Sequence, residues 1–236
     1  MKVKCLNTIL FKRGGEMQTL IFTAEGDYAR FRCPHTTTSA LTFSTIHPIA
    51  VRGLIGAILG VEYEQLYGYT KNMKIGIQVV NPIYKDTQSF NLIAQTNNNK
   101  SANFQSRIQF LRDVKYRIFV NSEIEKLELL KDTIKNRNYV FTPYLGCSEH
   151  IAKLEYEGIF KAVLSEEDLV DTIVPKQDVD INQVEDRTIF MDRIPTRNNK
   201  NREYLTYNNV VIAIGGSLSI KNSEVFKVGD YNVFFL

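Results

Sequence analysis

The chain lacks the features of a membrane or secreted protein. Its longest apolar run, from Gly53 to Val61, is about half as long as the roughly 20 residues that a membrane-spanning helix needs. The basic N-terminus is followed by too short an apolar stretch for a signal peptide. The three cysteines, Cys5, Cys33 and Cys147, do not make a disulfide framework. We therefore expect a cytoplasmic protein with no membrane partner.

The sequence is also poor in patterns that carry catalysis. It has only three histidines, no glycine-rich loop that ends in Gly-Lys-Ser/Thr, and no paired-carboxylate or Ser-His-Asp pattern. His47 stands at an expected helix start, which is a structural position. Cys33, His35, Cys147 and His150 form a possible Cys₂His₂ zinc site, but the spacings C-x-H and C-x-x-H are unlike those of common zinc modules. We expect no metal and no cofactor.

What the chain does contain is segregated charge. The formal net charge is only +3, yet residues 161–186 hold eight acidic residues and two lysines. By contrast, residues 187–203 hold five basic and two acidic residues, and residues 86–117 have the same balance. Segregated positive charge suits a polyanion such as nucleic acid. A solvated protein surface is the more frequent meaning of such runs, so charge alone does not decide the function.

Hydrophobic patterning predicts a mixed α+β chain. The expected strands cover residues 18–32 (interrupted near Gly26), 73–85, 112–121 and 151–164. The expected helices cover residues 46–60 and 122–137, the second with Ser122 as its N-cap. A long hairpin is expected over 89–110, and its tip consists of asparagines, lysine and serine. This order is that of a ferredoxin-like fold with a hairpin inserted between its two middle strands. We expect one domain over 1–164, followed by a smaller, mostly β region over 165–236.

The first expected helix carries three glycines, although each glycine costs about 1 kcal/mol relative to alanine in a helix interior. Gly56 and Gly60 are four residues apart, so they share one side of the helix, which we expect to pack against the rest of the chain. Arg52 and Gly53 lie nearer the helix start, where free N–H groups favour anions. Here a sugar-phosphate backbone is expected to approach.

The first expected strand ends in a row of aromatic and basic side chains. Its alternation places Tyr28, Arg30 and Arg32 on one face and Ala29 and Phe31 on the other. Such a row can stack on bases and pair with phosphates. The solvated outer face of an ordinary sheet fits the same pattern equally well.

Three stretches together carry a family resemblance. They are FTAEGDYARFRCPHTT (22–37), TFSTIHPIAVRGLIGAILG (42–60) and TPYLGCSEH (142–150). With them the chain resembles the Cas-five family of CRISPR-associated proteins, and more narrowly its type I-B variants. The resemblance implies a RAMP subunit of the RNA-guided surveillance complex Cascade. Such a subunit holds the repeat-derived 5′ handle of the CRISPR RNA (crRNA), while target DNA is read through base pairing by the guide.

The resemblance also implies partners and site residues. A thumb-like hairpin, here about residues 86–110, folds over the RNA against the neighbouring backbone RAMP subunit, and the large subunit docks alongside. The RNA-binding residues expected from it are Tyr28, Arg30, Arg32, His35, Thr36, Thr37, Arg52, Gly53, Lys100 and Arg107.

The resemblance bears on catalysis as well. One branch of the family cleaves precursor crRNA with a tyrosine, a lysine and a histidine adjacent to that lysine. This chain has no Lys-His pair, and in type I-B systems a separate RAMP endonuclease cuts the RNA. We therefore expect a non-catalytic subunit. The alternative is a metal-independent endoribonuclease with His35 or His150 as the base.

Overall fold

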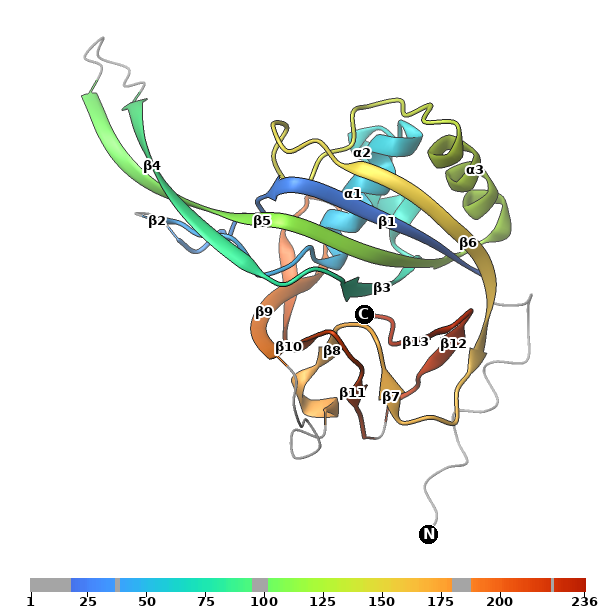
Figure 1. Cartoon of the computed structure of the whole chain (residues 1–236). Coiled ribbons are helices and arrows are strands. Elements are labelled where there is room, and N and C mark those ends of the chain that lie inside the picture. The colour runs from blue at the N-terminus through green and yellow to red at the C-terminus, as the bar shows by residue number, and fades with distance from the viewer. Residues whose placement is uncertain (1–17, 37–38, 95–101, 180–187, 222) are drawn as a thin grey trace.

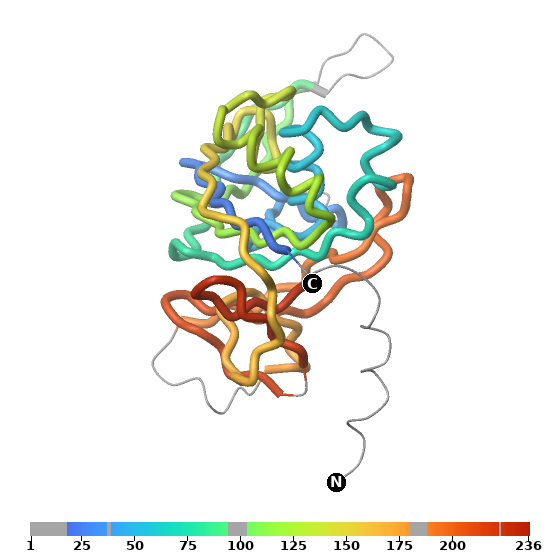
Figure 2. The backbone as a smooth tube through the Cα atoms, turned by 90° about the vertical axis from the view of Figure 1, so that its right-hand side faces the viewer, coloured from blue at the N-terminus to red at the C-terminus, as the bar shows by residue number. Residues whose placement is uncertain are grey.

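A twisted sheet forms the centre of the molecule. The computed structural model describes residues 18–36, 39–94, 102–179, 188–221 and 223–236. The sheet runs in the order β13-β12-β6-β1-β5-β2, and β3 and β4 also pair with β5. Its strands are β1 (Gln18–Ala29), β2 (Ser39–Ala40), β3 (Lys74–Val79), β4 (Tyr84–Ala94), β5 (Ala102–Ser122), β6 (Lys153–Leu164), β12 (Phe226–Val228) and β13 (Tyr231–Val233). The helices cover one side of this sheet, and much of the C-terminal region lies on the other side (Figures 1 and 2).

Four of the strands have the ferredoxin-like arrangement. They lie in the order β6-β1-β5-β3, and every neighbouring pair is antiparallel. Helix α1 (Pro48–Leu59) lies in the connection from β1 to β3, and α3 (Ile124–Lys135) connects β5 to β6. This topology confirms the fold class predicted from the order of the elements.

The long hairpin is formed by β4 and β5. The two strands pair from Tyr84 opposite Arg112 to Ala94 opposite Ala102, and the hairpin extends away from the body of the protein (Figure 1). The sequence predicted a hairpin arm and a separate following strand, but β5 is one strand of 21 residues. Its first half pairs with β4 and its second half with β1 and β3, so the hairpin is a direct extension of the central sheet.

Helix α1 begins and ends at residues with defined capping roles. The Nδ1 atom of His47 accepts a hydrogen bond from the Ala50 N–H at 3.2 Å, and Pro48 occupies the first helical position. At the other end, Gly60 adopts the left-handed φ of 70° and its N–H donates to the Gly56 carbonyl. The structural role predicted for His47 is confirmed.

The two glycines of α1 and the C-cap glycine, Gly60, have different surroundings. A Cβ atom added to Gly56 would lie 2.5 Å from Cδ1 of Leu66, because helix α2 (Tyr63–Thr70) packs on this side of α1. A Cβ atom added to Gly60 would lie 2.6 Å from Cγ1 of Val140. The packing predicted for these two glycines is therefore confirmed, although α2 itself was not predicted. An added Cβ atom at Gly53 would meet nothing within 4 Å among the described residues.

Two local predictions were wrong. Strand β1 runs without interruption through Gly26, where a Cβ atom would lie 2.9 Å from Cδ1 of Leu145. Ser122 is not an N-cap: it is the last residue of β5 and pairs with Gln18, and Glu123 precedes the first turn of α3. The sheet thus continues one residue further than the helix pattern suggested.

Both faces of β1 are buried. Leu20 and Phe22 belong to the larger core cluster under α1 and α3, whereas Ile21 packs with Phe119 and Val233 on the opposite face. No helix in the described part of the chain is long and apolar enough to cross a membrane.

The C-terminal region is mostly β, as predicted. Its remaining elements are β7 (Leu169–Val170), β8 (Val174–Pro175), the 3₁₀ turn η1 (Lys176–Asp178), β9 (Thr188–Asn198), β10 (Tyr204–Ile214) and β11 (Leu218–Ser219). Strands β8, β10 and β9 form one small sheet and β11 and β7 another, while β12 joins the central sheet by pairing with β6. The division at residue 165 stays a prediction, and the sheet pairing crosses it.

Candidate nucleic-acid interface

A cavity of about 380 Å³ opens beside the first half of α1 and collects basic side chains from distant parts of the sequence. The lining residues with cationic or amide groups are Arg30, Arg32, Arg52, Asn198, Lys200 and Arg202. No Asp or Glu is among the described residues that line it. We call it the basic cavity. Its five cations lack a balancing carboxylate within the lining, which favours an anionic occupant.

Arg30 and Arg32 reach the basic cavity because the backbone stays extended beyond the end of β1. Ala29 and Phe31 are buried, whereas Arg30 is half-buried and Arg32 is exposed, so the predicted alternation of faces is confirmed. The Arg30 N–H donates to the Leu145 carbonyl at 3.0 Å, which fixes the chain at this point. The Nε atom of Arg30 is buried and has no hydrogen-bond partner among the described residues.

Arg52 enters the same cavity from α1. Its Nη2 atom donates to the Met73 carbonyl at 3.2 Å, while its buried Nε atom has no partner in the described part of the chain. Burial lowers the pKa of the Arg52 guanidinium, although an arginine in a protein remains charged. Arg30 and Arg52 both line the basic cavity, and guanidinium groups are suitable donors to phosphate oxygens.

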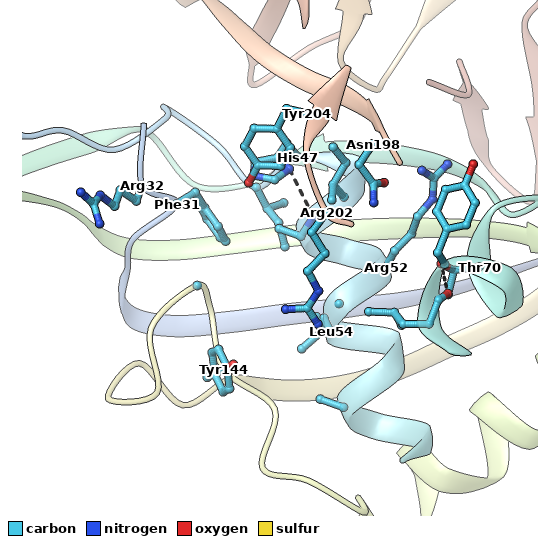
Figure 3. A pocket seen from close by; sticks show the side chains of 18 of the residues that line it. Phe31, Arg32, His47, Arg52, Leu54, Thr70, Tyr144, Asn198, Arg202 and Tyr204 are labelled. Carbon is cyan, nitrogen blue, oxygen red and sulfur yellow. Dashed lines mark hydrogen bonds between the residues drawn. The ribbon is translucent and has the colours of Figure 1, made fainter. Parts of the chain in front are cut away.

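The hairpin formed by β9 and β10 supplies the opposite wall. Arg202 lies in its turn with a φ of 63°, and its guanidinium lies 4.2 Å from the ring centre of Tyr63 in α2. Figure 3 shows Arg202 extending across α1 between Tyr204 and Tyr144, with Arg32 at the far edge of the cavity. The basic run over 187–203 was noticed in the sequence, but its residues were not assigned to the site.

The β9–β10 hairpin is held against the loop before α1. The Asp192 carboxylate accepts hydrogen bonds from the Ser44 N–H at 2.6 Å and from the Arg193 N–H at 2.7 Å. Tyr204 packs edge-on against His47, with ring centres 5.7 Å apart. These contacts fix the position of the hairpin that carries Lys200 and Arg202.

The other predicted site residues lie elsewhere. Tyr28 lines a second cavity at the base of the β4–β5 hairpin, and Arg30 lines both cavities. His35 is exposed in a loop, and the Thr36 hydroxyl donates to the Cys33 carbonyl at 3.0 Å. Neither His35 nor Thr36 lines a cavity described here.

The hairpin residue Arg107 lies beside this loop. Its side chain is exposed, and β2 pairs with β5 so that Ser39 lies opposite Arg107. The loop that contains His35 therefore leads to the hairpin arm. Thr37 and Lys100 lie outside the described residues.

The histidines do not form a metal centre with the cysteines. Within the described ranges, no three His, Cys, Asp or Glu side chains gather closely enough to hold a metal ion, and Cys33 and Cys147 are free thiols. Burial lowers the pKa of His47 to about 3, and burial also lowers the pKa of His150. Both imidazoles are therefore neutral near pH 7.

Comparisons with known proteins agree with this architecture. Residues 19–209 match the model of the family described as CRISPR-associated protein (Cas_Cas5). No curated protein sequence matches the chain. A CRISPR protein from Archaeoglobus fulgidus is 11% identical, with a TM-score of 0.56 over 92% of this chain and 98% of that one. A chain of a CRISPR RNA-guided surveillance complex is 12% identical, with a TM-score of 0.54 over 86% and 91%.

A further solved Cas protein is 19% identical, and the match covers 56% of this chain and 58% of the length of that protein. The TM-score of this match is 0.41. At such low identities the solved structures support the fold alone, and the family model supports the family. Since that model matches most of the chain, the protein belongs to the CRISPR-associated Cas-five family.

Proposed function

We propose that this protein is a non-catalytic subunit of a type I-B Cascade complex and that it binds the 5′ handle of the crRNA. Its partners in this proposal are the backbone RAMP subunit and the large subunit, and it meets target DNA only through the complex. One of the similar solved structures is a chain of a CRISPR RNA-guided surveillance complex, which is consistent with this assignment.

The observation that carries the proposal is the basic cavity. It combines Arg30, Arg32, Arg52 and Gly53, four residues proposed from the sequence, with Lys200 and Arg202, which the sequence did not assign. A single-stranded RNA end brings several phosphates close together, and guanidinium groups with free donors can bind each of them. Neutralising several phosphates at once makes such binding strong and dependent on salt.

Charge reversal tests the site. We expect the double variant Arg30→Glu/Arg32→Glu to bind a labelled handle RNA at least about 100-fold more weakly, because two charge-assisted contacts are replaced by repulsion. The matched control is Lys135→Glu/Arg137→Glu at the end of α3, which changes the net charge equally but lies outside the basic cavity. Equal affinities of the two double variants would contradict the proposed site.

A cleavage assay tests the absence of catalysis. Purified protein is incubated with labelled repeat RNA, with and without EDTA, and the products are separated by size. We expect intact RNA in both samples. Metal-independent cleavage that His35→Ala or His150→Ala abolishes would instead establish the alternative function, a processing endoribonuclease with that histidine as base.

A further inference from the structure

The second cavity, at the base of the β4–β5 hairpin, differs in chemistry from the basic cavity. Its volume is about 420 Å³, and its walls come from the end of β1, both hairpin strands and the loop before β6. We call it the aromatic pocket, after the rings of Tyr28, Phe90, Phe110 and His150 that line it. Arg30 forms part of its wall as well as of the basic cavity.

The four rings form one connected cluster. Phe110 lies at its centre: its ring centre is 6.3 Å from that of Tyr28, 5.5 Å from that of His150 and 6.0 Å from that of Phe90. The ring of Phe110 is nearly perpendicular to those of Tyr28 and His150, at 80° and 89°. The cluster therefore presents ring faces and ring edges in different directions, which suits a flat ligand inserted among them.

The hairpin presents this apolar surface on one face only. In the β4–β5 pairing, Gln88 lies opposite Ile108 and Phe90 lies opposite Ser106, so these residues share a face. Pocket residues of the hairpin, including Ile108, all lie on this face. Arg107 points to the other face, so the aromatic pocket and the phosphate contact proposed at Arg107 are separate features.

Polar atoms line the edge of the aromatic pocket. The Nε2 atom of His150 is buried and has no hydrogen-bond partner among the described residues. The loop around it is fixed, since the His150 N–H donates to the Cys147 carbonyl at 3.0 Å and the His150 carbonyl accepts from the Leu145 N–H at 2.7 Å. Gln88 and Glu149 add an amide and a carboxylate to the same wall. A nucleobase has this character: flat apolar faces and a polar edge.

We propose that the aromatic pocket binds a single unstacked base of the RNA, and that Arg30 binds an adjacent phosphate. The inference rests on the proposed function, because it takes the bound RNA as given. Arg30 lines both cavities, and its guanidinium group favours an anionic acceptor, which an apolar peptide side chain would not supply. A nucleotide meets both requirements, with its base in one cavity and its phosphate at the other.

The experiment uses the purified full chain and a synthetic RNA with the 5′ handle sequence of its own CRISPR locus. In a series of otherwise identical RNAs, each handle base in turn is replaced by an abasic ribose, which keeps every phosphate. We expect one position to lose affinity by roughly 5- to 150-fold, the usual range for loss of a stacked base. The other positions are expected to change little.

Pocket variants then locate that base. Ile108→Trp fills the pocket, and Phe110→Ala removes its central ring, so with either variant the intact RNA binds as weakly as the sensitive abasic RNA and the abasic change has no further effect. Phe104→Ala is the matched control, since it lies on β5 nearer the hairpin tip and outside the pocket lining. It is expected to leave the abasic penalty unchanged.

The outcomes separate this inference from the proposed function. Handle binding without any sensitive position, or with a sensitive position that persists in Phe110→Ala and Ile108→Trp, would overturn the base pocket and leave handle binding intact. Absence of handle binding by the unaltered protein would overturn both.

Discussion

Replacing Gly53 by alanine separates the stability of the fold from the RNA binding that we propose. Gly53 lies in the interior of α1, and an added Cβ atom would contact nothing within 4 Å among the described residues. Alanine is favoured over glycine in a helix interior by about 1 kcal/mol. We therefore expect Gly53→Ala to stabilise the protein, with a rise in Tm of roughly 2–4 °C for a chain of this size.

The same substitution is expected to weaken RNA binding. Gly53 lines the basic cavity beside Arg52, so the new methyl group would occupy the space into which we propose the sugar-phosphate backbone fits. Moving one phosphate out of reach of a charged donor costs about 1.5–3 kcal/mol, which corresponds to a loss of affinity of roughly 10- to 150-fold. A gain in stability would then accompany a loss of binding.

The assay combines thermal unfolding with fluorescence anisotropy of a labelled handle RNA at fixed salt. Gly68→Ala is a matched control, since Gly68 lies in α2, also has open space at its Cβ position and does not line the basic cavity. If Gly53→Ala binds RNA as tightly as Gly68→Ala does, no backbone approaches Gly53 closely and the reasoning about this helix is refuted.

Two further predictions concern charge. Because burial lowers the pKa of His47 to about 3 from an ordinary value of 6.5, the unfolded state takes up a proton that the folded state excludes. The contribution of His47 to the free energy of unfolding is therefore complete above about pH 6.5. It decreases as the pH falls, by about 2 kcal/mol near pH 5. Denaturant unfolding should show a larger loss in the unaltered protein than in His47→Asn, which keeps a capping side chain but removes this imidazole. Equal pH dependence of the two proteins would contradict the prediction. Lys200→Gln is expected to reduce the slope of log affinity against log salt by about 0.7, the contribution of one phosphate on single-stranded RNA. An unchanged slope in salt titrations would remove Lys200 from the interface.

The features that the sequence predicted well depend on local periodicity. The alternation of Tyr28, Arg30 and Arg32 against Ala29 and Phe31 follows from the two-residue repeat of extended backbone, and the structure has it. The β4–β5 hairpin and the order of the ferredoxin-like elements also follow from segment patterns. In each case the information lies within a few consecutive residues.

The features that the sequence did not predict depend on contacts between distant segments. The only buried residue of α2 is Thr70, so this helix has no apolar stripe by which to recognise it. Gly26 was taken as a break in a strand, whereas its lack of a side chain makes room for Leu145. Lys200 and Arg202 could be seen as part of a basic run, but only the docking of their hairpin beside α1 brings them to Arg52.

The basic cavity also shows why the C-terminal region matters to a site that the sequence placed in the first part of the chain. Cations gathered without carboxylates repel one another, so the elements that carry them must be held by other contacts. Asp192 provides one of these contacts, because its carboxylate accepts a hydrogen bond from the Ser44 N–H. Asp192 itself does not line the cavity. The ring of Tyr63 beneath Arg202 provides another. The ferredoxin-like part alone would retain Arg30, Arg32 and Arg52 but lose the wall that faces them, so the proposed RNA-binding surface depends on both sides of residue 165.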